Sequence, residues 1–254
     1  MRSRRCYSST MCGRYNIATD TQALMDAFGV VDEETSVDLV NRYNIAPSEP
    51  PPKGESSRER RLTRVPTIRV RGDRRVMHSA IWPLIPVWAR GIVPRFATAN
   101  ARSETMAKLP AYRHAWASNR RCLVPASSFV EWQAIAGSRR KQPWLVYLDD
   151  RRPMAFAGLW EYSHYNDGER VESCTIVTAP ANALMAEIHN IRKRMPVILE
   201  GRSEQETWLN GTKEEALAVA EPLTDGLLDA HPISTRINNP NARGRELLEP
   251  ISVQ

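Results

Sequence analysis

The chain reads RCLVPASSFVEW over residues 121–132, an apolar, strand-like stretch that carries a carboxyl group near its end. Glu131 lies between Val130 and Trp132, and burial beside them would favour the protonated carboxyl that a general acid requires. In the alternative, Val130 and Trp132 pack inward and Glu131 points to water on the polar face of a strand. The local sequence allows both arrangements.

Further segments rich in β-forming residues predict strands, and short polar turns separate them. Gly72 and Asp73 form such a turn, so the strands on either side are expected to pair as a hairpin. The predicted strands cover residues 67–70, 76–81, 145–148, 154–159 and 174–178. They indicate a meandering, mostly antiparallel β core.

Helical patterns occur at both ends of the chain. The first covers residues 19–28, with Thr19 or Asp20 as its cap and Gly29 after its end. The others cover residues 181–188, 203–209 and 213–223, where Pro222 marks the approximate end. Because strands and helices are interspersed without regular βαβ alternation, the sequence predicts an α+β fold in one domain, with helices flanking the β core.

Composition narrows the class of protein. With 254 residues, 42% of them hydrophobic, the chain can bury one substantial core, and no stretch approaches the roughly 20 apolar residues of a membrane span. The spacing of Cys6, Cys12, Cys122 and Cys174 fits neither a disulfide framework nor paired metal ligands, which favours free thiols in a reducing cytoplasm. No phosphate loop or zinc motif is visible, so we expect no metal and no nucleotide cofactor.

A net charge of +6 favours a polyanionic partner, and aromatic residues interleave with arginines as binding to a single nucleic-acid strand requires. We expect Trp116, Trp144, Trp160 and Trp208 in the core, and Trp82 and Trp132 as surface platforms for base stacking. Other candidates for stacking and phosphate contact are Trp88, Arg14, Arg90, Arg95, Arg102, Arg113, Arg120 and Arg121.

Residues 11–15 read MCGRY, and removal of everything up to Met11 would give Cys12 a free amine beside its thiol. Such a 1,2-aminothiol attacks an aldehyde twice and closes a five-membered ring. Residues 1–10 contain arginines but no apolar run, so they suit a removable leader or a mis-called start better than a secretory signal. The alternative is an internal Met-Cys pair with a buried thiol.

Two further polar residues are candidates for the same chemistry. His189 ends a predicted helix beside a basic run, where a histidine serves either as a helix cap or as a proton carrier. Asn100 could orient an oxyanion or an amino group, or it could form a backbone turn.

In order along the chain, residues 11–15, 42–47, 82–88, 100–105, 121–132 and 189–199 resemble the motifs of the SRAP (SOS response-associated peptidase) family. The resemblance implies a single α+β SRAP domain over residues 11–245, a leader over residues 1–10 that is absent or disordered, and a C-terminal tail over residues 246–254. It also implies a cytoplasmic, nucleoid-associated monomer that binds single-stranded DNA and captures abasic sites covalently.

Carried over by position, the resemblance implies that Cys12 forms a thiazolidine with the opened sugar. Asn100 would position the amine, Glu131 would donate a proton, and His189 would serve ring opening and reversal. The DNA-binding residues implied are Arg14, Arg102, Arg194, Trp82 and Trp132. Pro83 stands where the family more often has glycine, and residues 190–193 separate His189 from Arg194 by more than in shorter variants.

The sequence is compatible with three activities. The first is covalent capture of abasic sites, with lyase-like reversal and possible autoproteolytic removal of the residues before Cys12. The second is a cysteine-nucleophile peptidase or amidohydrolase that uses Cys12, His189 and Glu131 without a DNA-crosslinking role. The third is a non-covalent single-strand binder that relies on the tryptophans and arginines.

Overall fold

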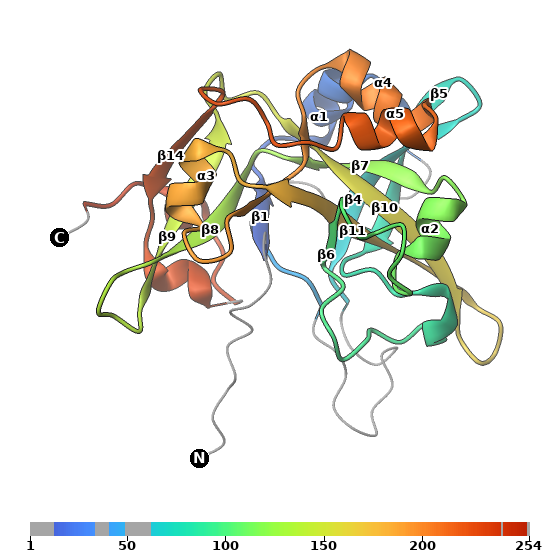
Figure 1. Ribbon diagram of the computed structural model, residues 1–254, viewed down its shortest axis with the longest axis horizontal. Helices are drawn as coiled ribbons and strands as arrows, with labels where there is room; N and C mark the ends of the chain where they lie inside the picture. The colour runs from blue at the N-terminus through green and yellow to red at the C-terminus, as the bar shows by residue number, and fades with distance from the viewer. Residues whose placement is uncertain (1–12, 34–40, 49–61, 240, 253–254) are drawn as a thin grey trace.

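The computed structural model describes residues 13–33, 41–48, 62–239 and 241–252, whose strands form two sheets (Figure 1). The smaller sheet has five strands, and each pair of neighbours is antiparallel. Their order is β14 (Leu228–Pro232), β9 (Lys141–Leu148), β8 (Ser128–Ala134), β1 (Arg14–Ile17) and β3 (Arg42–Ile45).

The larger sheet has nine strands. Its main path is β12 (Arg194–Pro196), β11 (Arg170–Pro180), β10 (Met154–His164), β7 (Arg121–Ala126), β4 (Arg64–Arg71), β5 (Arg74–Ile81) and β2 (Val30–Glu33). In addition, β6 (Asn100–Arg102) pairs in parallel with β11, and β13 (Ile198–Leu199) pairs with β10.

Residues 121–132 connect the two sheets, because they supply β7 to the larger sheet and β8 to the smaller one. Ser127 lies at the corner between them. Its backbone N–H donates to Asn16 O at 2.8 Å, and its hydroxyl accepts from Ala18 N at 2.9 Å. Asn16 in turn donates to the hydroxyl of Ser128. This corner holds β1 in register against β8.

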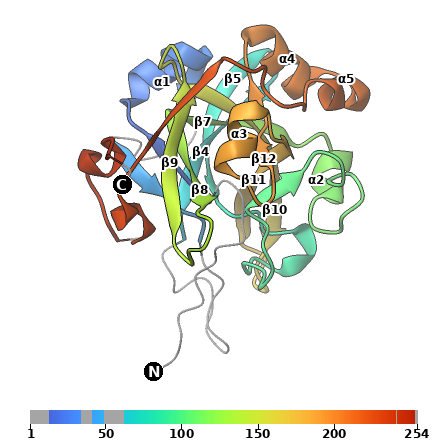
Figure 2. The same cartoon turned by 60° about the vertical axis from the view of Figure 1, so that its left-hand side comes forward.

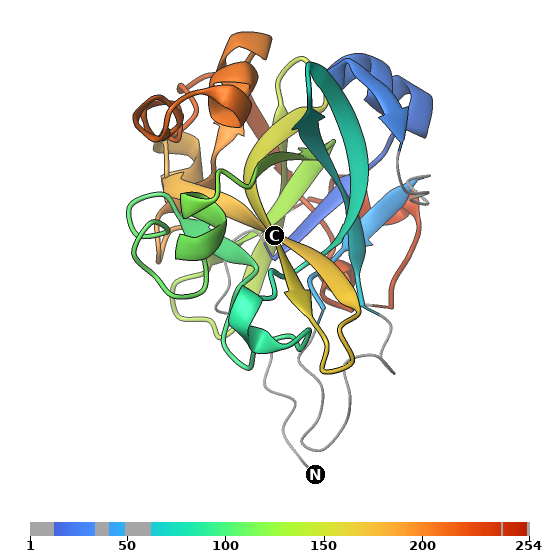
Figure 3. The same cartoon turned by 90° about the vertical axis from the view of Figure 1, so that its right-hand side faces the viewer.

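The helices lie outside the sheets. Figure 1 shows α1 (Thr21–Phe28), α4 (Arg202–Asn210) and α5 (Lys213–Ala218) together at one end, and Figure 3 shows α1 and the α4–α5 pair on opposite sides of the β4–β5 hairpin. Helix α2 (Arg113–Ala117) contacts β10, and α3 (Ala183–Ile188) contacts β8 and β12 (Figure 2). Short 3-10 turns are η2 (Val87–Ala89), η3 (Thr235–Asn238) and η4 (Arg245–Leu248). Within the described ranges, no helix is long and apolar enough to cross a membrane.

The predicted α+β class, the mostly antiparallel core and the hairpin at Gly72 are confirmed. Helix α1 begins at Thr21, because the carboxylate of Asp20 accepts from Ala23 N at 2.8 Å, and it ends at Gly29 with φ of 60°. One helix boundary is wrong. α5 ends at Ala218, where the N–H of Val219 already closes the last turn, so Pro222 lies beyond the helix.

An aromatic cluster joins the two sheets in the main core. Tyr15 of β1 packs edge-on against Trp82 and Phe156, with ring centroids 5.5 and 6.2 Å apart, and Phe129 of β8 packs against Phe156 at 5.9 Å. Trp82 is 0% exposed, and its indole N–H donates to Ala99 O at 2.9 Å. A buried tryptophan needs such a partner for its one polar group.

The prediction that Trp82 is a surface platform is therefore wrong, and with it the prediction that Trp82 contacts DNA. The core positions predicted for Trp116 and Trp208 are confirmed, whereas Trp144 and Trp160 are only partly buried and pack against the core. Whether distant segments pack over a tryptophan and supply a carbonyl to its N–H is not revealed by the local sequence.

The segment predicted as a C-terminal tail packs against the smaller sheet as far as residue 252. Leu247 of η4 is buried with Val130, Ile233 and Ile237, and Ile251 N donates to Pro232 O at 3.0 Å. Residues 253–254 lie outside the described residues, as does the predicted leader, residues 1–10.

Replacing Trp82 by phenylalanine tests its buried position. Trp82→Phe removes the hydrogen bond to Ala99 O and leaves space in the core, so we expect the free energy of unfolding to fall by about 1–3 kcal/mol. Urea denaturation measures it. Trp88→Phe, at a half-exposed indole, is the matched control and should change stability much less. Equal, small effects in both variants would contradict the buried assignment.

Candidate active site at the start of β1

The first described residues of the chain lie beside Glu131. In the antiparallel pairing of β1 with β8, Arg14 lies opposite Val130 and Tyr15 opposite Phe129. Extending that register by one residue sets Gly13 opposite Glu131. Cys12, which precedes Gly13, lies outside the described residues. The register therefore directs the start of the folded chain toward this carboxyl.

The side chain of Glu131 is buried, with 1% exposure. Phe129, two residues earlier on the same face of β8, packs in the main core, whereas Val130 and Trp132 pack on the opposite face with Ile233 and Ile237. Both faces of the strand are thus covered, so the arrangement in which Glu131 points to water is wrong. The buried alternative is confirmed.

His189 follows α3 and is held next to β8. Its backbone N–H donates to Met185 O at 2.8 Å, which makes it the helix cap that the sequence allowed. The end of α3 is tied to β8 because Gln133 Nε2 donates to Glu187 O at 3.1 Å, and Asn190 exchanges two hydrogen bonds with the backbone of Ala134.

The imidazole of His189 suits a proton carrier as well. Burial lowers the pKa of His189, and the positive charges of Lys141, Arg192 and Arg194 lower it further, against a backbone contact with Arg194 that raises it. Its Nδ1 lies 3.3 Å from Arg194 O. A neutral ring whose Nδ1–H faces this carbonyl keeps Nε2 as a base.

Asn100 lies on β6, opposite Ile176 of β11. Its backbone carbonyl accepts from the hydroxyl of Tyr112 at 2.9 Å, and the preceding carbonyl, Ala99 O, accepts from Trp82 and from Ile176 N. Yet both polar atoms of its carboxamide are buried and have no hydrogen-bond partner among the described residues. The backbone is fixed, and the side chain keeps its hydrogen-bonding capacity for a ligand.

Arg194 connects the strands that carry these residues. Its Nη2 donates to Thr178 O at 2.7 Å and to Glu104 Oε2 at 2.9 Å, while Nη1 contacts the other oxygen of Glu104. Thr178 lies on β11 opposite Arg102 of β6. The guanidinium is buried and neutralised by a carboxylate, so the prediction that Arg194 contacts phosphate does not fit this structure. Arg194 braces β6, β11 and β12.

The chain is similar to known proteins over most of its length. A model of the family described as SOS response associated peptidase (SRAP) matches residues 11–240. The chain belongs to this family. The Abasic site processing protein YoqW of Bacillus subtilis (strain 168) is 31% identical, over 94% of this chain and 99% of its own. The Abasic site processing protein HMCES of Rattus norvegicus is 28% identical, over 69% of this chain and 57% of its own.

Solved structures share the fold of this SRAP domain. A crystal structure of a protein from Bacteroides thetaiotaomicron has a TM-score of 0.65 and 28% identity, over 75% of this chain and 82% of that one. A second, from Bordetella bronchiseptica, has a TM-score of 0.68 and 24% identity, over 88% of this chain and 100% of that one.

The arginines of the SRAP domain divide into paired and open groups. Arg120 binds the buried carboxylate of Glu161, and Arg121 is buried and donates to Gly211 O and Thr212 O, so neither is the phosphate contact that was predicted. Arg102 is exposed next to Asn100. Three other arginines that the sequence suggested for phosphate contact are exposed as well: Arg90, Arg95 and Arg113.

The aromatic surface differs from the prediction. The indole N–H of Trp132 donates to Asn238 Oδ1 at 2.8 Å, and the ring packs in part against a hydrophobic cluster, so it is no free platform. Trp88 and Phe96, each 52% exposed, stack on each other with centroids 6.2 Å apart. They line a shallow cavity of about 390 Å³ with Leu109 and Tyr112. The sequence analysis missed Phe96, whose loop shows no periodicity.

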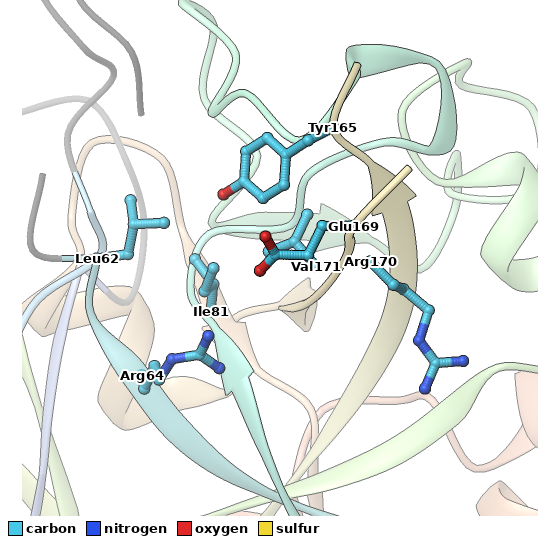
Figure 4. Close-up of a pocket in the computed structure, with 7 residues that line it drawn as sticks. All are labelled: Leu62, Arg64, Ile81, Tyr165, Glu169, Arg170 and Val171. Atoms are coloured by element: carbon cyan, nitrogen blue, oxygen red, sulfur yellow. The ribbon is translucent and has the colours of Figure 1, made fainter. Parts of the chain in front are cut away.

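A second hollow, of about 240 Å³, lies apart from these residues (Figure 4). Tyr165 and Glu169 line it, together with Arg64, and Figure 4 shows the guanidinium of Arg170 directed away from them. Arg170 pairs instead with Glu172 at 2.8 Å. This hollow contains none of the residues that the SRAP motifs supply. Among the described residues, no group of three His, Cys, Asp or Glu side chains is gathered as a metal site.

Stability should depend on pH through Glu104. The hydrogen bond from Arg194 is the largest cause that lowers the pKa of the Glu104 carboxyl in the folded protein. The contribution of this ion pair to the free energy of unfolding is therefore fully present above the ordinary carboxyl pKa of about 4.3. It is lost as the pH falls through the lowered pKa of the folded protein. Glu104→Gln should destabilise the protein clearly at pH 7 and much less at pH 3.

Urea denaturation at the two pH values measures this difference. Glu187→Gln, which changes an exposed carboxyl on α3, serves as the control and should show little effect at either pH. A cost of Glu104→Gln that stays the same at pH 7 and pH 3 would contradict the ion pair with Arg194.

Proposed function

We propose that this protein captures abasic sites in single-stranded DNA by forming a thiazolidine at an exposed amino-terminal Cys12. The observation that carries the proposal is the β1–β8 register, which directs the start of the chain toward the buried Glu131. Membership of the SRAP family and the names of the relatives, abasic site processing proteins, support the same substrate.

The first step is attack of the Cys12 amine on the aldehyde of the opened sugar. The reference pKa of an α-amino group, roughly 7.7–8.0, leaves an appreciable neutral fraction near pH 7. Asn100 holds the amine in line, because its carboxamide has no partner among the described residues and its backbone is fixed. The product is a carbinolamine.

The second step closes the ring. Protonated Glu131 donates to the departing hydroxyl, so water leaves and a Schiff base forms. The Cys12 sulfur then adds to the same carbon, the thiol proton returns to the Glu131 carboxylate, and the ring nitrogen keeps its one hydrogen. Each adduct releases one water and requires no oxidant or reductant.

His189 serves the opening of the sugar and the reversal of the adduct. Because burial lowers the pKa of His189, the ring is largely neutral near pH 7 and its Nε2 accepts a proton from the sugar hydroxyl. The proton then returns to the ring oxygen. Reversal uses the same group in the opposite direction, which gives the site its lyase-like character.

The strand binds to the positively charged surface around this site. Arg14 and Arg102 contact phosphates, and the exposed stack of Trp88 and Phe96 receives an unpaired base. Trp82 and Arg194 support the site from the interior and do not contact DNA. The protein acts as a monomer associated with the nucleoid.

The residues before Cys12 must be absent for this chemistry. The Cys12 thiol can itself attack the carbonyl of Met11, transfer the acyl group to sulfur and free the amine, after which water hydrolyses the thioester. This autoproteolysis accounts for the word peptidase in the family description. A cysteine amidohydrolase remains the second candidate, because the same three side chains would act on a small amide.

Intact-mass spectrometry tests the proposal directly. Protein that begins at Cys12 should gain the mass of an abasic single strand less one water, and Cys12→Ala should gain no mass unless borohydride is added to trap a Schiff base. Cys12→Ser should form only a Schiff base that borohydride traps, because it keeps the amine and lacks the thiol. Unmodified strands with a homogeneous Cys12-exposed preparation would exclude covalent capture and favour the amidohydrolase or the non-covalent binder.

Changing Glu131 tests the proton donor. Glu131→Gln keeps the size of the buried side chain but cannot supply the proton, so the crosslinking rate should fall by about 10²–10⁴. The rate is followed on denaturing gels between pH 5 and pH 9. Glu187→Gln, at an exposed carboxyl, should keep the rate of the unchanged protein. Full crosslinking by Glu131→Gln across this range would remove Glu131 from the mechanism.

A further inference from the structure

A loop near the C-terminus, described over residues 236–239 and 241–245, reaches back to the start of the domain; we call it the C-terminal loop. Arg14 Nη2 donates to Asn238 O at 3.2 Å, and Asn44 Nδ2 donates to Asn239 O and Ala242 O at 3.0 and 3.1 Å. Trp132 binds Asn238 as well. The side chains predicted to meet DNA on this face thus hold the loop in place.

Buried residues on either side of the loop limit its movement. Ile237 of η3 and Leu247 of η4 lie in one hydrophobic cluster with Val130. Gly244 has φ of 108°, a conformation that favours glycine, and turns the chain after Arg243. Glu246 pairs with Arg236 at 3.5 Å. The loop is therefore a fixed part of the surface near the start of β1.

Two arginines meet at one buried carboxamide within this arrangement. Arg14 Nη1 donates to Asn44 Oδ1 at 2.6 Å, and Arg243 Nη1 donates to Ala242 O at 3.0 Å, the carbonyl that also accepts from Asn44 Nδ2. Asn44 is buried, with 8% exposure, and it connects the Arg14 guanidinium to the carbonyl of Ala242 that the Arg243 guanidinium also contacts. Burial lowers the pKa of Arg14, and the neighbouring charge of Arg243 lowers it further.

We propose that Arg14 and Arg243 together bind one phosphate of the single strand, on the side of the lesion nearest Cys12. This assignment rests on the proposed function. An anion that lies between two neighbouring cations is attracted by both charges. Guanidinium groups match the geometry of phosphate oxygens better than ammonium groups do.

The position along the chain fits a phosphate that flanks the captured sugar. Arg14 follows Cys12 by two residues, and two residues of chain span at most about 7 Å. A strand whose sugar is bound to Cys12 therefore has its neighbouring phosphates within reach of the Arg14 side chain. Arg243 lies outside all six SRAP motifs, so it adds a contact that the family resemblance does not supply.

The test measures binding without the covalent step. The probe is a single strand that contains a tetrahydrofuran abasic analogue, which cannot open to an aldehyde, and fluorescence anisotropy gives its affinity at several salt concentrations. Arg243→Gln should lower the affinity about tenfold at low salt. It should also reduce the slope of log K against log salt by about 0.7, the value for one phosphate contact to a single strand.

Arg74→Gln is the matched control because it removes the same charge from an exposed arginine at the tip of the β4–β5 hairpin. In Figure 1 this tip and the C-terminal loop lie at opposite ends of the molecule. Arg243→Lys keeps the charge and should retain the slope while it loses part of the affinity. A slope for Arg243→Gln equal to that for Arg74→Gln would overturn the phosphate site.

Crosslinking of the same variants to a true abasic strand separates this inference from the proposed function. At saturating DNA, Arg243→Gln should crosslink at the rate of the unchanged protein, because the reacting groups are intact. If no variant crosslinks but Arg243→Gln still reduces the salt slope, covalent capture fails and the phosphate site stands. Loss of crosslinking at saturating DNA in Arg243→Gln alone would contradict a role limited to binding.

Discussion

The pairing of β1 with β8 is the interaction on which the rest of this site depends. A slip of one residue in an antiparallel pair turns every side chain to the opposite face, so the register has to be fixed. The corner at Ser127 fixes it with one hydrogen bond to Asn16 of β1 and one to Ala18 just after the strand, and Tyr15 adds its ring to the aromatic cluster below. The same corner joins the two sheets. The connection between the sheets and the position of the first described residues therefore depend on the same few hydrogen bonds.

The remaining site residues come from distant parts of the chain and are held by buried polar groups. Arg194 connects the strand after His189 to β11 and β6, and Trp82 fixes the carbonyl before Asn100. The indole N–H of Trp82 and both Nη atoms of Arg194 have partners, whereas neither polar atom of the Asn100 carboxamide has one among the described residues. A fixed backbone that carries an unpartnered carboxamide is what positioning of a ligand requires.

The surface charge of the SRAP domain depends on which of its arginines are buried and paired and which are exposed. Arg75, Arg120, Arg121 and Arg194 are wholly or largely buried and meet carboxylates or carbonyls, so they contribute little to the field at the surface. Arg14 and Arg102 lie beside the site and keep neutral partners or solvent around them. The net charge of +6 is therefore a weaker indication of a polyanionic partner than the few arginines near Gly13 that are not paired with carboxylates.

The sequence by itself determined the α+β class, the hairpin at Gly72, the first helix with its end at Gly29, and the family, because these depend on local periodicity and on motifs in order. Only the tertiary structure decided which polar and aromatic side chains are open. Trp82 and Arg194 carry the same chemistry as Trp88 and Arg102, yet the first two are buried while the last two are exposed. Burial depends on which distant segments pack over a side chain and supply its polar partners, and no local pattern contains that information.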